Sequence, residues 1–322
     1  MQVRRYALRR VLQVVPVMLF IAIINFWLIH AAPGDPAAAL AGDGAPQEFI
    51  EALRKDYGLD RPLLDQLGTY LGTLLKGDLG YSFAYRRSVV DVIVERLPAT
   101  LLLVFASQIP AIVLGTLLGA FSARHHPSRI DSVVTAISLS LYAVPIFWSG
   151  LLLILVFAVW LRWLPASGMI DLLAPTEGIG RILDIARHMA LPVTALFLYS
   201  LPQYVRLTRA SVIEVMREDF ITTARAIGYS ENVVFFRHAL RNALLPAVTV
   251  AGLSLSFVFA GALLTETVFG WPGMGRLMYE GVLKRDYPVL MGVFLVTSAL
   301  VLIVGILTDL LYAALDPRVS YE

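Results

Sequence analysis

The chain has 322 residues, of which 58% are hydrophobic and 16% are charged, with a formal net charge of +2 and no cysteine. Several uncharged stretches exceed the roughly 18 residues that cross the core of a bilayer, so the sequence predicts a polytopic membrane protein, and no nucleic-acid partner is expected. The missing cysteines exclude disulfides, thiolate metal sites and cysteine nucleophiles.

The first apolar run, Val11–Ala32, follows four arginines and ends at a Pro-Gly-Asp-Pro turn. A cleaved signal peptide is an alternative, since a basic start, an apolar run and small residues are all present. The run is longer than the roughly 7–15 residues of a typical signal-peptide core. We therefore favour an uncleaved membrane anchor.

Residues 33–96 have the composition of a soluble segment. Amphipathic patterns predict helices at Gln47–Tyr57 and Pro62–Leu75, and a third short helix, Val89–Leu97, leads back to the membrane. This segment is interpreted as a small helical module outside the membrane, and it is too short to be a separate enzyme.

Five further spans are predicted after residue 96; the third is long enough to tilt or to bend at Pro145, and the fourth is interrupted by Pro192 and Pro202. A loop is expected over Arg162–His188, and another connects the last two spans. The predicted spans are Leu97–Ala123, Ser132–Leu161, Met189–Val205, Asn242–Thr265 and Tyr287–Thr308.

Adjacent histidines, His125 and His126, follow the second span. A metal site is one interpretation, but no third ligand stands at metal-site spacing and a proline follows at once. A solvated basic turn is favoured, and no metal is expected.

The distribution of basic residues predicts the orientation. If the N-terminus is inside, the inner segments hold thirteen Lys and Arg residues and the two short outer loops hold six. The long segment 33–96 holds seven basic and ten acidic residues, and its length weakens the positive-inside rule there. Both termini are therefore expected in the cytoplasm, and the helical module outside.

Between the fourth and fifth spans lies a charged segment, Arg206–Pro246, with six arginines and four carboxylates; we call it the elbow. An apolar stripe at helical spacing, formed by Val212, Met216, Phe220, Ala224 and Ile227, predicts one amphipathic helix. Gly228 can end that helix, and Ser230 can cap the next. A plain connector lying on lipid headgroups is the alternative interpretation.

The elbow resembles the cytoplasmic coupling segment of permease subunits in binding-protein-dependent ABC importers. Further stretches, spread over nearly the whole chain, are similar to the B-type permease of the dipeptide, oligopeptide and nickel branch. The matching stretches are APGDPAA (32–38), GLDRPL (58–63), GDLG (77–80), ERLPATLLL (95–103), RHALRNALLP (237–246), ETVFGWPGMG (266–275), RDYP (285–288) and LDPR (315–318).

The resemblance implies an all-α polytopic inner-membrane protein with six transmembrane helices, a cytoplasmic coupling elbow and a small helical extracytoplasmic module. Three parts are expected: 1–32 (N-terminal stub and first span), 33–96 (module) and 97–322 (permease core, with the coupling segment at 206–246). It would form half of a translocation pathway for peptides or similar small solutes.

The same resemblance implies several partners: a second permease subunit, two ATP-binding subunits or domains, and an extracytoplasmic substrate-binding protein. ATP and Mg²⁺ would bind the partner subunits, because this chain has no phosphate-loop sequence and is not expected to be an enzyme. The coupling signature has Thr222 or Thr223 where the general family has Glu. The expected ATPase-coupling residues are Thr222, Thr223, Ala224, Arg225, Ala226, Gly228, Tyr229 and Ser230.

Polar residues inside spans are candidates for the pathway lining, although packing between helices explains each of them as well. The candidates are Asn25, Ser107, Gln108, Ser138, Tyr142, Ser254, Ser256, Thr297 and Ser298. At the outer ends, Glu266, Trp271 and Gly273 are candidates for an outer gate or a receptor-facing turn, and a well-packed loop is the alternative.

Two other classes of membrane protein are alternatives. An ion-coupled secondary transporter usually places a charged side chain near the middle of the membrane, and the predicted spans have charges only at their ends. An intramembrane protease or hydrolase would show H-E-x-x-H or G-x-S-x-G, and neither occurs. The ABC permease is favoured, with the secondary transporter as the alternative.

Overall fold

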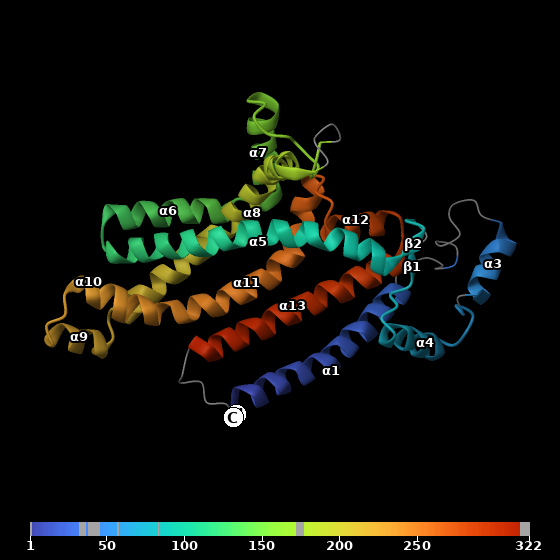
Figure 1. The fold of residues 1–322 in the computed structure, drawn as a ribbon, viewed down its shortest axis with the longest axis horizontal. Coiled ribbons are helices and arrows are strands. Elements are labelled where there is room, and N and C mark those ends of the chain that lie inside the picture. Colours follow the sequence, from blue (N-terminus) through green and yellow to red (C-terminus); the bar gives the residue numbers. More distant parts are fainter. Residues whose placement is uncertain are drawn as a thin grey trace.

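Long helices dominate the chain, which is elongated along one axis (Figure 1). The computed structural model describes residues 2–31, 37, 46–56, 58–82, 84–171 and 177–315. The longest helices are α1 (Gln2–Ala31), α5 (Val89–Arg124), α8 (Gly178–Val215), α11 (Arg241–Val268) and α13 (Tyr287–Leu315).

Three helices in the described part are long and apolar enough to cross a membrane: α5, α8 and residues Tyr287–Leu310 of α13. A fourth candidate is a bent pair, in which α6 (Arg129–Ala143) is followed by α7 (Ile146–Leu153) and the π-helical η1 (Ile154–Trp160). The all-α membrane fold is thus confirmed, whereas the number of six spans stays a prediction.

Of the two alternatives for this span, a tilt or a bend at Pro145, the structure has the bend, and it is sharp: the two halves of the pair meet at 95°. Pro145 lacks the amide hydrogen that would continue the helix and disfavours the helical conformation of Val144, which is extended. Figure 1 shows α7 turned away from the long axis of α6. The pair is therefore a broken span or a re-entrant segment rather than one tilted helix.

Two predicted breaks do not occur. Val89–Leu97 and the second span form the single helix α5, which includes Pro98 and Pro110. The loop expected over Arg162–His188 ends at Gly178, where α8 begins and continues through Pro192 and Pro202. Membrane helices tolerate such prolines because neighbouring helices compensate for the freed carbonyls. Rules based on local sequence therefore overestimate how strongly these prolines interrupt a helix.

The segment predicted to form the extramembrane module, residues 33–96, contains the two predicted helices as α3 (Gln47–Asp56) and α4 (Leu63–Leu75). The sequence did not reveal a two-stranded hairpin, in which β1 (Tyr81–Ser82) pairs antiparallel with β2 (Arg87–Ser88). The second outer loop likewise contains an unpredicted helix, α12 (Met274–Leu283). Strands of two residues are too short for a periodic pattern to be visible.

Two glycines allow α5 to lie directly against α8. A Cβ atom on Gly115 would stand 2.6 Å from the Tyr204 Cβ, and one on Gly119 would stand 2.5 Å from the Val205 carbonyl oxygen. The same interface holds a buried hydrogen bond, in which Gln108 Nε2 donates to Ser200 Oγ at 2.8 Å. Small residues at such contacts permit the close helix packing that stabilises membrane bundles.

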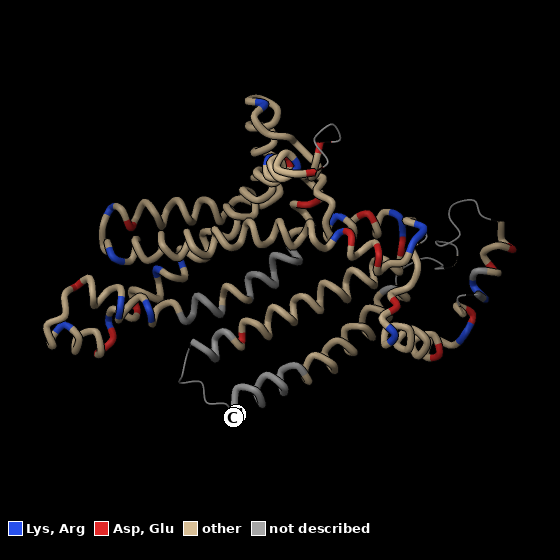
Figure 2. Tube along the Cα trace, viewed as in Figure 1, with Lys and Arg blue, Asp and Glu red and all other residues tan. Residues whose placement is uncertain are grey.

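Charged residues concentrate in separate regions (Figure 2). One lies at the end of the long axis that carries α9 (Asp219–Ala226) and α10 (Glu231–Val233), and the opposite end carries α3, α4, the hairpin and α12. Further charges lie near the start of α8. The helices between the two ends are nearly free of charge, as a bilayer core requires.

We predict that Gly119→Val lowers the thermal unfolding midpoint of the purified protein in detergent. Forcing side-chain atoms into a packed interface costs about 1–3 kcal/mol or more, and the nearest obstacle at Gly119 is backbone. Gly305→Val on α13 is the matched control, because a Cβ atom there meets nothing within 4 Å. Equal midpoints for the two variants would contradict this account of the α5–α8 contact.

Candidate functional site

The elbow forms a short helix held between two long ones. Helix α8 ends at Val215, and α9 follows after a turn at Met216–Glu218. After Gly228 and Ser230, α10 continues through the π-helical η2 (Val234–Leu240) into α11. Figure 1 shows α9 and α10 at one extreme of the molecule. The helix–glycine turn–helix arrangement is thus present, but the single amphipathic helix predicted from Val212 to Ile227 is wrong.

The turn at Met216–Glu218 also changes which residues are buried. Val212 and Ala224 of the predicted stripe are buried, whereas Phe220 is 41% and Ile227 69% exposed. Ile221, outside the stripe, is fully buried against Val234 and Ala239. A helix break resets the angular register of the residues that follow it, so a stripe drawn across the break loses its meaning.

Gly228 ends α9 with the hydrogen bonds of a Schellman motif. The Tyr229 amide donates to the Ala224 carbonyl at 3.3 Å, and the Gly228 amide donates to the Arg225 carbonyl at 3.0 Å. The φ angle of Gly228 is +98°, a region in which residues with a Cβ atom are strained. The glycine predicted to end the helix therefore does so for the expected reason.

An ion pair closes this turn. Arg225 donates from Nε to Glu231 Oε1 at 2.8 Å and from Nη2 to Oε2 at 3.3 Å. Its guanidinium lowers the pKa of the Glu231 carboxyl. Arg225, expected to offer a polar contact to a partner, is thus engaged within its own chain and links α9 to α10. Ser230 occupies the N-cap position of α10, but its side chain makes no capping hydrogen bond.

The rest of the elbow is fixed to α5. Arg124, the last residue of α5, donates to the side chain of Asn232 and lies 5.4 Å from the ring centroids of both Phe235 and Phe236. Phe235 and Val212 are buried in the same apolar cluster as Ala123. These contacts of Val212, Asn232, Phe235 and Phe236, which we call the base of the elbow, therefore attach it to the helix bundle.

The outer surface of α9 and its following turn is open. All of the predicted coupling residues are exposed except Ala224, which packs inward. Three large side chains of this segment, Phe220, Ile227 and Tyr229, are exposed as well, with Tyr229 48% exposed. Exposed apolar side chains at a charged end of a molecule are compatible with a protein–protein contact. The sequence periodicity did not predict that Phe220 and Ile227 are exposed, because it assigned both side chains to the buried face.

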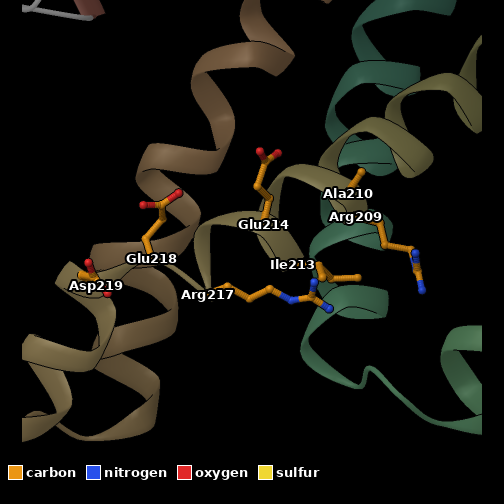
Figure 3. Close-up of a pocket in the computed structure, with 7 residues that line it drawn as sticks. All are labelled: Arg209, Ala210, Ile213, Glu214, Arg217, Glu218 and Asp219. Carbon is orange, nitrogen blue, oxygen red and sulfur yellow. The ribbon is translucent and has the colours of Figure 1, made fainter.

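A depression of about 630 Å³ lies at the junction of α8 and α9. Figure 3 shows Glu214 and Glu218 extending on the same side of this junction, with Arg217 directed toward Ile213. The depression is lined by Arg209, Ala210, Ile213, Glu214, Arg217, Glu218 and Asp219. It adjoins the exposed face of α9, so a partner that contacts α9 also meets a surface of mixed charge.

A carboxylate cluster binds three helices together beside this junction. Asp131, 4% exposed at the start of α6, accepts hydrogen bonds from Ser122 of α5 at 2.6 Å and from Arg209 Nε of α8 at 2.6 Å. Arg209 Nη2 donates to the second oxygen at 2.7 Å, and His126 Nδ1 lies 2.8 Å from it. We call these four residues the Asp131 cluster.

The Asp131 cluster changes the interpretation of the paired histidines. Of the two histidines, His126 contacts the Asp131 carboxylate and His125 does not. The Nδ1 atom of His125 lies 2.8 Å from the Phe121 carbonyl oxygen. His126 belongs to a partly buried network rather than to a solvated turn. Among the described residues, no group of three His, Asp or Glu side chains could hold a metal.

The predicted pathway residues do not form one lining. Asn25 donates to the Met291 carbonyl at 3.1 Å, and Gln108 bonds Ser200 within the α5–α8 interface, so both serve helix packing. Ser298 is half-buried on α13. Ser254 and Ser256 lie on α11, but their side chains are outside the described residues. Ser107 and Ser138 bond carbonyls of their own helices.

Tyr142 lines a groove of about 670 Å³ between α6, α8 and α11. Four residues of α8 with polar side chains, Tyr199, Gln203, Arg206 and Arg209, line the same groove, and Arg209 is engaged by Asp131. The Arg206 guanidinium carbon lies 5.1 Å from the centroid of the Tyr142 ring. No sequence pattern predicts this juxtaposition, because it depends on how α6 packs against α8.

The outer candidates are interior residues. Glu266 is fully buried and accepts hydrogen bonds from Thr100 Oγ1 at 2.6 Å and from the Arg276 amide at 3.0 Å. Trp271 is also fully buried, and its Nε1 donates to the Ala99 carbonyl at 2.9 Å. A Cβ atom on Gly273 would collide with the Glu266 carboxylate. In this chain the turn is well packed, as in the alternative interpretation, and a role of these buried residues in an outer gate or a receptor-facing turn stays a prediction.

The fold and the elbow define a membrane permease subunit, and comparison with known proteins identifies its family. The family described as "Binding-protein-dependent transport system inner membrane component" matches residues 115–321. Its N-terminal counterpart, "Binding-prot-dependent transport system membrane comp, N-term", matches residues 3–104. The chain belongs to this family and is thus a multi-pass inner-membrane permease subunit of the ABC importer type, not an enzyme.

Curated relatives cover nearly the whole chain. The di/tripeptide transport system permease protein DppB of Pseudomonas aeruginosa (strain UCBPP-PA14) is 40% identical, with 98% of each chain covered. The oligopeptide permease AppB of Bacillus subtilis (strain 168) is 38% identical, and the glutathione permease GsiC of Escherichia coli O6:H1 is 37% identical; each covers 98% of this chain and 99% of its own. These relatives support the permease class and not the secondary-transporter alternative.

Among solved structures, the MetNI methionine ABC transporter in an inward-facing conformation has a TM-score of 0.57 and 17% identity. The match covers 70% of this chain and 97% of that chain. At this identity the likeness supports the permease fold alone.

We predict that Asp131→Ala lowers the thermal unfolding midpoint in detergent. Removing one partner of a buried ion pair costs about 3–5 kcal/mol, because the other charge is left without compensation, although Arg209, being 24% exposed, reduces that cost. The double variant Asp131→Ala, Arg209→Leu should recover part of the loss. A double variant less stable than Asp131→Ala would contradict the proposed pairing.

Proposed function

We propose that this chain is one of two permease subunits that together form the translocation pathway of an importer for peptides or similar small solutes. The peptide class is supported by the names of the curated relatives, which transport dipeptides, tripeptides, oligopeptides and glutathione. Import in these systems begins with a substrate-binding protein, which would dock at the end of the molecule that carries α3, α4 and α12.

Helix α9 is proposed to couple the permease to an ATPase subunit. It is short, exposed and attached at both ends to long helices, so a displacement of α9 moves α8 and α11 with it. Thr222, Thr223, Arg225 and the turn at Gly228–Ser230 would contact an ATPase subunit, with Phe220 and Ile227 as apolar anchors. Rigid elements connected in this way are how hinge and rocking motions pass between subunits.

The same placement supports a proposal for the orientation. Helix α1 begins, and α13 ends, toward the end of the long axis that carries α9, with the two helices running antiparallel (Figure 1). We propose that this end is cytoplasmic, so that both termini and the elbow lie inside, and that residues 33–96 form the extracytoplasmic module ahead of a permease core at 97–322. The bias of basic residues supports this orientation.

ATP and Mg²⁺ would bind only the two partner ATPase subunits in this proposal. The chain lacks a phosphate-loop sequence, and its contribution to the reaction is mechanical. The permease would convert closure of the ATPase pair into opening of the groove-bearing helices toward one side of the membrane.

Site-specific cross-linking tests this assignment. Because the chain has no cysteine, Ile227→Cys introduces a unique thiol at a position that is 69% exposed. In native membranes, a short thiol-reactive photo-cross-linker on this residue should attach an ATPase subunit, identified by mass spectrometry. Leu64→Cys on α4, 72% exposed, is the control and should not capture that subunit. A failure of Ile227→Cys to do so, with the intact complex present, would refute docking at α9.

We also predict that Gly228→Val separates ATP hydrolysis from uptake. A side chain at a φ of +98° costs about 1–2 kcal/mol of strain, which corresponds to roughly tenfold in the population of the docked α9 conformation. The membrane level of the protein should be normal, while ATP-driven uptake in proteoliposomes falls by up to about tenfold.

Gly77→Val is the matched control for this experiment. Gly77 also has a positive φ, +77°, and an added Cβ atom there meets nothing within 4 Å, as at Gly228. It lies between α4 and the hairpin, remote from α9. Equal uptake rates for Gly228→Val and Gly77→Val would contradict the proposed role of the Gly228 turn in coupling.

A further inference from the structure

The groove between α6 and α8 contains a cation that the packing of the bundle does not use. Helix α8 carries no charged residue from Met189 to Val205, and Arg206 follows directly. Arg206 is exposed within a structure whose central helices are almost uncharged (Figure 2). Arg206 thus stands at the boundary between the uncharged part of α8 and the elbow, and its side chain lines a groove shared with α6 and α11.

The two arginines of this turn of α8 point to different parts of α6. Arg209 bonds Asp131 in the first turn of α6, whereas the guanidinium of Arg206 lies over Tyr142 in its last turn. Eleven residues of helix separate these partners, about 16 Å along the axis. Helical side chains lean toward the N-terminus of their helix, and for α8 that direction leads away from the α9 end and toward the middle of the bundle.

Arg206 also lacks the compensation that Arg209 has. Within the part of the chain that the structure describes, the ion pairs include Arg209 with Asp131, and none includes Arg206. Its contact with the Tyr142 ring stabilises the cation through the face of the ring and leaves the N–H groups of the guanidinium free to donate. An anion that enters the groove would therefore meet an unneutralised, oriented donor.

Three further side chains of the groove suit a peptide backbone. Tyr199, 45% exposed, and Tyr142, 53% exposed, present hydroxyl groups and ring faces, and Gln203 offers both a donor and an acceptor. A guanidinium binds a carboxylate through two parallel hydrogen bonds, which a lysine ammonium cannot reproduce. The terminal carboxylate is the one anionic group common to every unmodified peptide, whatever its sequence.

We propose that this groove is a station in the translocation pathway at which Arg206 binds the terminal carboxylate of the peptide in transit. The inference rests on the proposed function as a peptide permease. Arg206 is then a specificity-determining residue for solutes with a free carboxylate, with Tyr142 holding its guanidinium toward the groove. The aromatic and amide side chains contact the peptide without reading its sequence.

The test uses the complete transporter with its binding protein in proteoliposomes. ATP-driven uptake of trialanine and of trialanine amide is measured for the wild type, Arg206→Gln and Arg206→Lys. Arg187→Gln, an exposed arginine on α8 outside the groove, is the matched control. Thermal unfolding midpoints of all variants verify that the fold is retained.

For Arg206→Gln, uptake of trialanine should fall by about tenfold or more, since a charge-assisted hydrogen bond contributes at least this factor to an equilibrium. Uptake of the amide should stay within about twofold of wild type, because a neutral terminus never forms the bidentate contact. Arg206→Lys should give an intermediate rate, and Arg187→Gln should equal the wild type for both solutes.

Equal losses for both peptides would assign Arg206 to packing or to a neighbouring subunit and overturn the inference, as would unchanged uptake of trialanine. A wild-type transporter that imports neither peptide would instead refute the proposed function and the inference with it. If the wild type imports trialanine but not its amide, equilibrium dialysis of trialanine with the complex lacking its binding protein decides. Weaker binding to Arg206→Gln but not to Arg187→Gln supports the inference, and equal binding overturns it.

Discussion

The contact between α5 and α8 is the constraint on which the other features depend. Gly115 and Gly119 allow the two backbones to approach within the distance at which a single added carbon collides, and the Gln108–Ser200 hydrogen bond fixes their register in the interior. Further along, Arg209 of α8 reaches Asp131 only because α8 lies beside α5 and α6. The groove at Arg206 and the base of the elbow are consequences of the same placement.

Helix α8 links these parts mechanically. Its 38 residues span about 57 Å, from the outer loop to the turn before α9, without a break at either internal proline. One face contributes Tyr199, Gln203 and Arg206 to the groove, and the end of the helix contributes Glu214 to the junction with α9. A movement of α9 and a change in the shape of the groove therefore involve the same rigid body.

The two ends of the molecule differ in how much of their side-chain surface is engaged within the chain. At the end that carries α12 and the hairpin, two buried carboxylates are hydrogen-bonded: Glu266 with Thr100, and Asp286 with Ser82 at 2.6 Å and the Ala84 amide at 3.2 Å. These bonds tie α11 to α5, and the hairpin segment to the turn between α12 and α13. At the elbow, by contrast, α9 buries only Ile221 and Ala224 and leaves the remainder of its surface open, as expected for a surface that completes its contacts with another protein.

The sequence by itself determined the membrane class, most helix positions, the bend at Pro145 and the turn at Gly228, because apolar length, proline and glycine act through local chemistry. The short motifs identified the permease family, since they occur in order along the chain. Tertiary structure alone decided that Phe220 and Ile227 are exposed and Ile221 buried, because the break after Val215 resets the helical register. It also decided that Glu266 and Trp271 are packed inside, and that Arg206 meets Tyr142 across the groove. Contacts between residues distant in sequence depend on the packing of whole helices, which periodicity within each helix does not encode.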